Sequence, residues 1–373
     1  MKIGIYTQPL RTNYGGILQA WAMQKVLRDM GHDVTTFDSD PFLSLSWKKK
    51  PYVYSKRFIS KLLGRIDTIF LEKKYNRERK IIMQNLQLFI EKHINQTIFR
   101  NIEEISADNY DILLAGSDQV WRPRYNRNIY HSFFDFAEHS RVKRIAYAAS
   151  FGTDEWEYTE EQTKRCAELA KEFSVISVRE NSGVDLCNNY LGVDAVHVLD
   201  PTMLLKRKDY ENLIDNGTPT HEPKGNLLCY ILDETEEKNS LINKVAKDRG
   251  LKPYRGQAKI HNTKVSLEER VQPPVEQWLR NFRDASFVIT DSFHACVFSI
   301  IFGKPFVVVD NKQRGSARLQ SLMSLFQLED HLLSSAKDYN TIKSYLIPNI
   351  SYQKWTEMQI ISISFLKEVL SKL

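Results

Sequence analysis

The chain has 373 residues, of which 42% are hydrophobic and 26% are charged, and its formal net charge at pH 7 is +6. This composition, without a low-complexity tract or an internal repeat, is typical of a soluble globular protein and excludes the disordered, fibrous and disulfide-rich secreted classes. The length exceeds the usual size of one hydrophobic core, so we expect two domains.

Cysteine spacing and the first residues indicate the compartment. The four cysteines, Cys166, Cys187, Cys229 and Cys296, stand far apart without a Cys-x-x-Cys pair. This spacing favours neither a zinc site nor a disulfide scaffold, and it fits a reducing cytoplasm. Residues 1–10 lack the apolar core of a signal peptide, and no run reaches the ~18 apolar residues of a spanning helix. We expect a cytoplasmic protein, with the inner face of the membrane as the alternative location.

Short apolar runs and helical patterns alternate along the first half of the chain. Apolar residues recur at helical spacing from Ile17 to Leu27, and Gly31 closes that helix. Alternation of this kind predicts a parallel sheet covered by helices. Strands are predicted over 2–7, 33–38, 110–116, 144–152, 173–180 and 196–200, and further helices over 159–171 and 182–191. We assign this N-terminal α/β domain to residues 1–215.

Residues 216–226 gather Gly, Pro, Thr and charged residues, which indicates a domain boundary. We assign the second series of strands and helices to a C-terminal α/β domain over 216–373. Its strands are predicted over 227–233, 287–290 and 306–310, and its helices over 274–284, over about 292–302, after Ser316 and from Tyr352. An alternative for the last helix is that it packs back on the first domain. Two such domains in tandem predict ligand binding in a central cleft, at the carboxyl ends of the strands.

A basic helical insertion interrupts the first domain at about 41–100. Residues 47–80 hold twelve Lys or Arg against three Asp or Glu, so this stretch carries +9 and the rest of the chain −3. Because these cations are confined to one arm, we expect no nucleic-acid binding. Apolar residues also recur at helical spacing from Phe58 to Phe70. This stripe suits an anionic membrane near lipid-linked acceptors. The alternative is packing on its own domain or on a partner subunit of a homo-oligomer.

One histidine follows the strand predicted over 287–290, where the chain reaches the edge of the cleft. Asp291 or Ser292 is a suitable N-cap for a helix that begins at Phe293, which places His294 in the first turn. The free backbone N–H groups of such a turn, with the positive end of the helix dipole, attract a phosphate or a carboxylate. The alternative is a structural histidine packed under a loop.

Polar residues and glycines also cluster where other predicted strands end. The glycines let the backbone approach a ligand closely, but they form no Gly-x-Gly-x-x-Gly fingerprint, so we expect no dinucleotide. The predicted acceptor or cleft residues are Asn13, Tyr14, Gly15, Gly16, Gln19, Gly116, Ser117, Asp118, Gln119, Trp121, Glu180 and Asp291. Each has a structural alternative, such as a tight turn for the glycines or a core position for Trp121.

Seven segments of the chain, among them Leu-Asp-Pro-Thr-Met-Leu-Leu and one that contains Thr-Asp-Ser-Phe-His, occur in the order seen in one known family. They are residues 12–34, 109–126, 143–152, 176–180, 199–205, 287–309 and 314–330. Together they resemble the polysaccharide pyruvyl transferase family over nearly the whole chain, apart from the arm at 41–100. The resemblance implies two Rossmann-like α/β domains with a central cleft, a GT-B-like fold. It also implies transfer of a pyruvyl group from phosphoenolpyruvate to sugar hydroxyls, often as a ketal, in surface or extracellular polysaccharide biosynthesis.

The resemblance implies roles for particular residues. His294 is similar to the family's active-site histidine, and Arg179 is similar to the arginine that helps to hold phosphoenolpyruvate. Well-studied members carry an arginine where this chain has Ser292, so either another cation takes its place or the donor differs. The predicted donor-binding residues are Arg179, Ser292, Phe293, Arg314, Ser316 and Arg318. We expect no metal and no cofactor, since phosphoenolpyruvate is a co-substrate.

The reaction leaves two tasks open for His294, which suits both because histidine gains and loses a proton near neutral pH. It supplies the proton that C3 of the donor receives, or it stabilises the departing phosphate. Two other functions also stay open, a nucleotide-sugar glycosyltransferase of GT-B type and a non-catalytic sugar-binding protein. The triplet Asp38–Asp40 is similar to the Asp-x-Asp of some glycosyltransferases, but such triplets are common by chance. The saccharide acceptor is a nucleotide sugar, a lipid-linked unit or a polymer.

Overall fold

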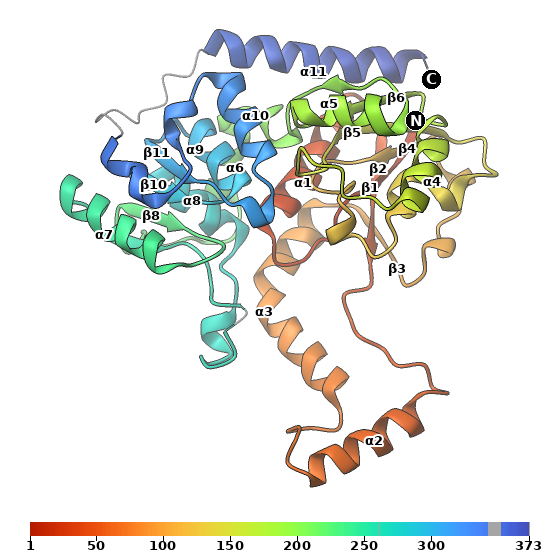
Figure 1. Cartoon of the computed structure of the whole chain (residues 1–373), viewed down its shortest axis with the longest axis horizontal. Coiled ribbons are helices and arrows are strands. Elements are labelled where there is room, and N and C mark those ends of the chain that lie inside the picture. The colour runs from red at the N-terminus through yellow and green to blue at the C-terminus, as the bar shows by residue number, and fades with distance from the viewer. Residues whose placement is uncertain (261, 342–351, 373) are drawn as a thin grey trace.

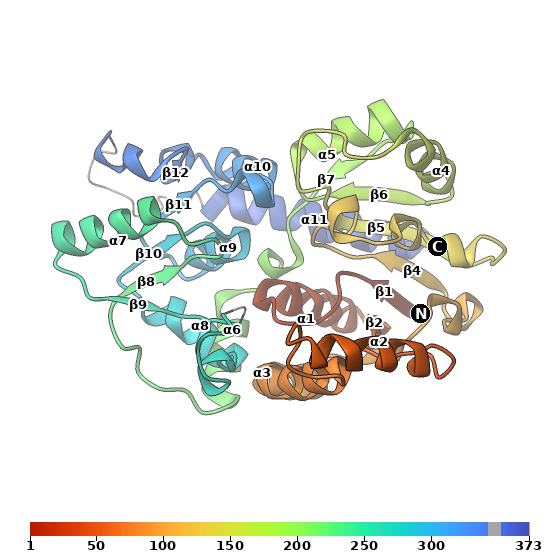
Figure 2. The same ribbon diagram turned by 60° about the horizontal axis from the view of Figure 1, so that its bottom comes forward.

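A computed structural model describes residues 1–260, 262–341 and 352–372, which form two parallel sheets side by side (Figures 1 and 2). The first sheet has seven strands in the order β3-β2-β1-β4-β5-β6-β7, and every neighbouring pair is parallel. Its strands are β1 (Lys2–Tyr6), β2 (Asp33–Ser39), β3 (Gln96–Phe99), β4 (Ile112–Ala115), β5 (Lys143–Ala149), β6 (Val175–Val178) and β7 (Val196–His197). The α/β class predicted from the sequence is confirmed.

The second sheet has five parallel strands in the order β12-β11-β10-β8-β9. They are β8 (Leu227–Tyr230), β9 (Pro253–Arg255), β10 (Phe287–Thr290), β11 (Phe306–Val309) and β12 (Leu332–Leu333). The sequence did not predict β3, β9 and β12. All three lie at sheet edges and are only partly buried, so they lack the continuous apolar run of a central strand.

Both faces of the first sheet are buried, as expected for a parallel sheet. Along β4, Ile112 and Leu114 join one core cluster, while Leu113 and Ala115 join the other. Helix α9 is buried at all nine positions, which explains why its sequence is apolar all round. The helices that cover the sheets are α1 (Tyr14–Asp29), α4 (Glu160–Ala170), α5 (Asn181–Leu186), α6 (Arg207–Asn216), α7 (Glu236–Arg249), α8 (Val275–Asp284), α9 (Phe293–Ile301) and α10 (Ala317–Phe326).

Only part of the predicted insertion at 41–100 leaves the body of the molecule. Helix α2 (Lys50–Leu62) has no buried residue and lies well apart from both sheets (Figure 1). Helix α3 (Leu71–His93) returns to the body and buries residues in its second half, including Leu86 and Phe89. Strand β3 then joins the first sheet beside β2. Residues 41–81, which we call the basic arm, are therefore the projecting part.

The last helix, α11 (Tyr352–Lys372), spans both halves of the molecule (Figure 1). Its Ser362 hydroxyl accepts a hydrogen bond from the Leu199 backbone N–H at 3.0 Å, and its Trp355 indole donates to the Met203 carbonyl at 3.0 Å. The Phe365 ring also lies 6.4 Å from that of Tyr147 in β5. Helix α11 thus contacts the segment that connects the first sheet to the second.

Candidate active site

A cleft of about 850 Å³ lies between the two sheets, lined by loops that follow their strands. Nine residues predicted for the site line it: Asn13, Asp118, Gln119, Asp291, Ser292, Phe293, His294, Arg314 and Arg318. They come from loops after β1, β4, β10 and β11, and from the first turns of α9 and α10. The carboxyl ends of the strands of both sheets therefore meet at one cavity, as the sequence predicted.

His294 lies where the N-termini of two helices meet. The Ser292 hydroxyl caps α9 by accepting a hydrogen bond from the Ala295 backbone N–H at 3.5 Å, which holds His294 in the first turn. The first turn of α1 faces it from the other half of the molecule. A Cβ atom at Gly15 would lie 2.1 Å from Nδ1 of His294, so glycine is what permits this approach. Two positive helix ends next to one histidine make this part of the cleft attractive to an anion.

The charged residue next to His294 is Asp200, which lies behind the lining of the cleft. His294 Nε2 is buried, lies 3.6 Å from Asp200 Oδ2 and has no hydrogen-bond partner within the described residues. Burial raises the pKa of Asp200, but the adjacent His294, Arg179 and Thr202 outweigh it and hold that pKa well below its usual range. Asp200 is therefore a carboxylate at neutral pH, and its charge fixes the orientation of the imidazole.

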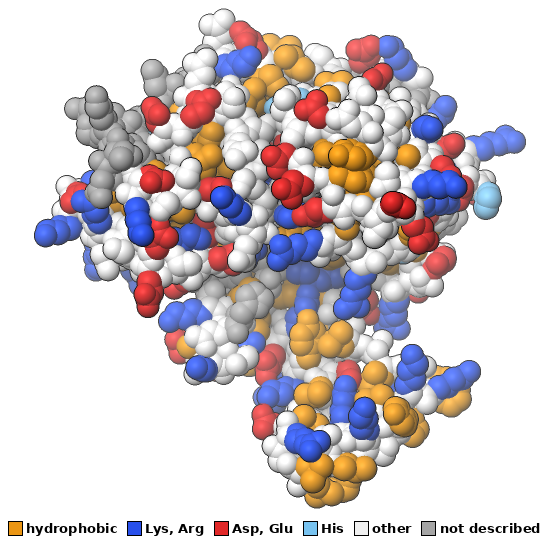
Figure 3. Space-filling model, viewed as in Figure 1, with side chains coloured by type: hydrophobic (Ala, Val, Ile, Leu, Met, Phe, Trp, Pro, Cys, Tyr) orange, Lys and Arg blue, Asp and Glu red, His pale blue; other side chains and the backbone are white. Residues whose placement is uncertain are grey.

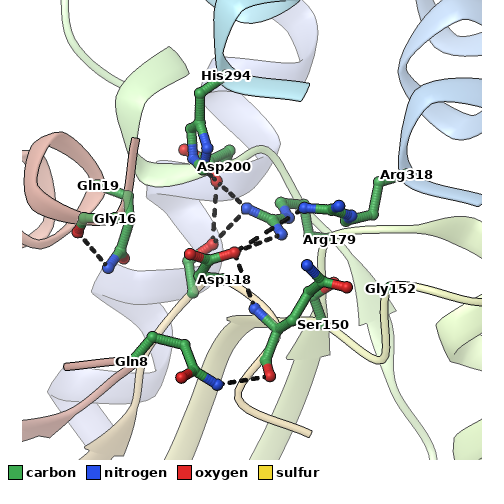
Figure 4. A network of polar contacts seen from close by, with 12 residues as sticks. Gln8, Gly16, Gln19, Asp118, Ser150, Gly152, Arg179, Asp200, His294 and Arg318 are labelled. Carbon is green, nitrogen blue, oxygen red and sulfur yellow. Dashed lines mark hydrogen bonds and ion pairs between the residues drawn. The ribbon is translucent and has the colours of Figure 1, made fainter. Parts of the chain in front are cut away.

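Two arginines that the sequence predicted for the donor site, Arg179 and Arg318, lie side by side and both point toward Asp118 (Figure 4). The Arg179 guanidinium lies 4.4 Å from the Phe293 ring centroid, and the Arg318 guanidinium lies 5.6 Å from it. The Arg179 side chain is 1% exposed and pairs with Asp200 at 2.7 Å and with Asp118 at 3.5 Å. Arg179 thus lies behind Phe293, outside the cleft lining, whereas Arg318 lines the cleft.

Arg318 has the donor capacity that an anionic ligand needs. Its Nη2 donates to the Arg314 carbonyl at 2.8 Å, its Nη1 lies 3.9 Å from Asp118, and its buried Nε has no partner within the described residues. Burial and the nearby Arg179 lower the pKa of Arg318 to about 10. Arg314, in contrast, is engaged with Asp233 by two hydrogen bonds of 2.5 and 2.9 Å. A buried, incompletely paired guanidinium is stabilised by a phosphate or carboxylate.

Asp118 holds a strained position directly after β4. Its backbone has a φ of 72°, a left-handed conformation that costs a non-glycine residue roughly 1 kcal/mol. Its carboxylate accepts hydrogen bonds from the Gln119 backbone N–H at 2.9 Å and from the Asn13 amide at 3.4 Å. Burial raises the pKa of Asp118, but Arg179, His294 and Arg318 outweigh it and lower that pKa overall. In this conformation the Asp118 carboxylate lies between Arg179 and Arg318, at 3.5 and 3.9 Å.

Two aromatic residues predicted for the cleft lie in the core instead. Tyr14 stacks on Trp278 at 5.3 Å and joins the two halves of the molecule, so its ring is covered and does not reach a sugar. Trp121 stacks on Phe133 at 4.8 Å and is fully buried in the core of the first domain. For Trp121 the core position given as its alternative is therefore the one observed.

Other predicted residues shape the backbone around the cleft. Glu180 accepts hydrogen bonds from the backbone N–H groups of Phe151 and Gly152. The Gln19 amide donates hydrogen bonds to the Thr7 hydroxyl and to the Gly16 carbonyl. The Ser117 hydroxyl donates to Asp200, and the Ser316 hydroxyl donates to Asp310. Gly116 packs against Ile5 and Thr7. These residues lie behind the lining, where they position other groups.

The sequence did not predict several residues that line the cleft, chiefly residues in the loops after β1, β8 and β9. The missed polar residues of the cleft are Gln8, Arg11, Thr12, Tyr125, Tyr230, Glu234, Arg255, Gln257, Lys259, Asn262, Gln272 and Asn311. Arg11 pairs with Asp38 at 2.8 Å, and Asp40 pairs with Arg100 at 3.0 Å, so the Asp38–Asp40 triplet has structural partners. Across the ranges that the structure describes, no group of three or more His, Cys, Asp or Glu is arranged to hold a metal.

Replacing Arg179 with lysine is expected to lower the free energy of unfolding by about 2 kcal/mol, because an ammonium cannot serve Asp200 and Asp118 together. Urea unfolding measures this loss. Direct donor binding by Arg179 stays a prediction that requires Phe293 to move, and calorimetry with phosphoenolpyruvate tests it in the same variant. Unchanged stability would show that the buried pairs contribute little.

The arrangement of two parallel α/β domains around a cleft defines a GT-B-like fold, and solved structures agree. HepE of Anabaena, solved in complex with UDP and glucose, is 13% identical to this chain, with a TM-score of 0.56 and all of both chains covered. The UDP-GlcNAc 2-epimerase of Methanocaldococcus jannaschii is 9% identical, with a TM-score of 0.51 and all of both chains covered. At these identities the likeness shows the fold alone.

The family follows from the sequence itself. The model of the family described as polysaccharide pyruvyl transferase matches residues 13–313, which include His294, Arg179 and Asp200. The chain therefore belongs to the polysaccharide pyruvyl transferase family and is a transferase. A comparison with curated proteins finds no significant match.

Proposed function

We propose that the protein transfers a pyruvyl group from phosphoenolpyruvate to hydroxyl groups of a saccharide, forming a ketal during the synthesis of a surface or extracellular polysaccharide. The observation that carries this proposal is the His294–Asp200 pair, which stands at the meeting of two helix N-termini beside the incompletely paired Arg318. This set combines a proton-transfer group with an anion-binding wall in one cleft.

The charge of the cleft supports an anionic donor. Phosphoenolpyruvate carries about three negative charges on a carboxylate and a phosphate, which bidentate cationic donors match best. The lining contains five Lys or Arg against three Asp or Glu: Arg11, Arg255, Lys259, Arg314 and Arg318 against Asp118, Glu234 and Asp291. Ser292, which stands where well-studied relatives carry an arginine, caps α9. We assign the missing cation's role to Arg318, which lines the cleft with Ser292 and Phe293 and lies 5.6 Å from the Phe293 ring centroid.

In the proposed reaction His294 gives a proton to C3 of phosphoenolpyruvate, and C2 becomes electrophilic. A sugar hydroxyl attacks C2 and passes its proton to the phosphate, which leaves as hydrogen phosphate when the C2–O bond breaks. A second sugar hydroxyl then attacks C2 and closes the ketal, and its proton returns to His294. Asp200 keeps the imidazole in place throughout, because its carboxylate stays ionised beside Nε2.

The test is to incubate the protein with phosphoenolpyruvate and a panel of saccharide acceptors and to measure inorganic phosphate. Acceptor-dependent phosphate release, with a matching gain of one pyruvyl group in the mass of the product, is the expected result. A parallel arm with UDP-sugars tests the glycosyltransferase alternative, since HepE holds UDP and glucose on the same fold. UDP release without phosphate release would replace our proposal, and saccharide binding without either product would indicate a non-catalytic protein.

Replacing Arg318 with lysine is expected to weaken phosphoenolpyruvate binding about tenfold or more in calorimetry, because a point charge cannot reproduce the planar fork of a guanidinium. Arg314→Lys is the matched control. The hydrogen bonds of Arg314 are already taken by Asp233, so its replacement should change donor affinity less. Equal affinities in both variants would remove Arg318 from the donor site.

A further inference from the structure

The basic arm presents an amphipathic helix that no other part of the described chain covers. Trp47, Tyr52 and Leu62 are 75%, 71% and 73% exposed. Tyr52, Ile59 and Leu62 follow one another at intervals of seven and three residues, so they share one face of α2. Figure 3 shows apolar and basic side chains gathered on this projection. Exposed apolar residues grouped in this way indicate an interaction surface.

The contacts of α2 turn this face away from the molecule. Tyr54 packs against the Phe70 ring at 5.2 Å, and Arg57 pairs with Glu72 at 2.7 Å. These contacts fix the inner side of α2 against the start of α3. The predicted alternative in which the apolar stripe packs on its own domain does not describe this structure, because α2 buries no residue. The exposed apolar face of α2 is therefore available to a partner from outside the chain.

The charge of the arm identifies the kind of occupant. Residues 47–80 carry twelve Lys or Arg against three Asp or Glu, whereas the rest of the chain carries a net negative charge. Lysines flank the apolar face, and Lys49, Lys56 and Lys61 are exposed. Two arms of two copies, paired face to face, would bring these like charges together. We propose that the basic arm binds the surface of an anionic membrane, with its apolar side chains in the interface and its lysines on the lipid head groups.

This surface is connected to the cleft by α3. Arg270 pairs with Glu78 of α3 at 3.0 Å, and the Gln272 backbone N–H donates to the Ile82 carbonyl at 3.0 Å. Gln272 itself lines the cleft, together with Lys259 from the same loop region. A membrane-bound arm therefore holds the lip of the cleft close to the lipid surface. If the proposed function holds, the acceptor class that this geometry serves is a lipid-linked saccharide, presented at the membrane.

The mode of attachment is peripheral. Within the described ranges no helix has both the length and the apolar character that crossing a bilayer requires. Binding through α2 and its lysines is therefore expected to be reversible and to weaken with salt, because screening at higher ionic strength shortens the reach of surface charges. The cytoplasmic location stays a prediction. The proposed surface is consistent with its alternative, the inner face of the membrane.

Co-sedimentation of the full-length protein with vesicles tests the proposal. Binding is expected to vesicles that contain phosphatidylglycerol, to be absent with phosphatidylcholine alone, and to be lost at high salt. Replacing Lys49, Lys56 and Lys61 together with glutamine should weaken partitioning on the order of 100-fold, given the energy that each lysine gains near an anionic surface. The matched control is glutamine at Lys143, Lys164 and Lys171, which are exposed on the first domain and should leave binding unchanged.

A second variant separates the apolar contribution, with glutamine at Trp47, Ile59 and Leu62. It should lose vesicle binding while phosphate release with a water-soluble acceptor stays at the parent level, because these residues lie outside the cleft. Failure of vesicle binding in the parent protein, or equal loss in the control, would overturn the membrane proposal without touching the proposed function. A dimer in sedimentation velocity that dissociates in this variant would assign the face to a second copy of the chain.

Discussion

Replacing His294 with asparagine is expected to lower kcat by ~10²- to 10⁴-fold, the range typical of a lost general acid. Asparagine keeps the approximate size of the side chain and one hydrogen-bonding group, but it carries no proton to the donor at neutral pH. Binding of phosphoenolpyruvate should weaken far less, since Arg318 and the two helix N-termini remain. Single-turnover phosphate release measures the rate, and calorimetry measures the binding.

The stability of this variant distinguishes a catalytic histidine from a structural one. Asp200 keeps hydrogen bonds from Thr202, Ser117 and Arg179 when His294 is replaced. The free energy of unfolding should therefore stay within about 1 kcal/mol of the parent. A variant that unfolds early and yet turns over normally would show that His294 serves packing, the structural alternative raised by the sequence.

Replacing Gly15 with alanine is expected to displace His294 and to reduce turnover by roughly 10²-fold, the effect of a misplacement of about 1 Å. The added methyl group would meet Nδ1 of His294 at 2.1 Å and its Cγ at 2.2 Å, far inside contact distance. Overpacking of this kind also costs about 1–3 kcal/mol of stability. Urea unfolding and phosphate release measure the two effects.

A neighbouring glycine provides the control, and a double-mutant cycle identifies the cause. Gly16 also lies in the first turn of α1, but a methyl group there would meet the Asn13 amide at 3.2 Å and Asp118 Oδ2 at 3.5 Å, so Gly16→Ala should be tolerated far better than Gly15→Ala. In a His294→Gly background the clash at Gly15 is removed, and Gly15→Ala should then cost almost no stability. An equal cost in both backgrounds would mean that α1 and not His294 suffers from the substitution.

The sequence predicted the central strands and helices because their apolar runs and N-caps are local features. Helix α9 was expected over about 292–302 and occurs at Phe293–Ile301, capped by Ser292. Strand β3 was missed because it is exposed at a sheet edge and follows the basic arm. Local patterns specify what a segment becomes, whereas an edge strand depends on the neighbour that it pairs with.

The candidate site was predicted less completely, because it depends on which charges meet across the cleft. Asp200 lay in a segment that resembled the family and was the last residue of the strand predicted over 196–200, and that strand end was the signal that could have found it. Its importance comes from Arg179 and His294, which are distant in the sequence. Arg314 and Arg318 looked equivalent in the sequence. The structure shows that Asp233 pairs with Arg314, which leaves Arg318 as the arginine that can bind a ligand.

Helix α11 makes a second connection between the two halves of the molecule. The chain passes from the first half of the molecule to the second before β8, and α11 returns to contact Leu199 and Met203 beside that passage. Asp200 lies between those two contacts and faces His294, so the double connection supports the segment that holds this pair.

The two halves are also joined at the lip of the cleft, where Gln272 forms hydrogen bonds with Tyr14, Thr12 and Asn85 of the first half. Because the walls of the cleft are connected at two places, we expect the groups around His294 to keep their geometry when a bulky saccharide binds.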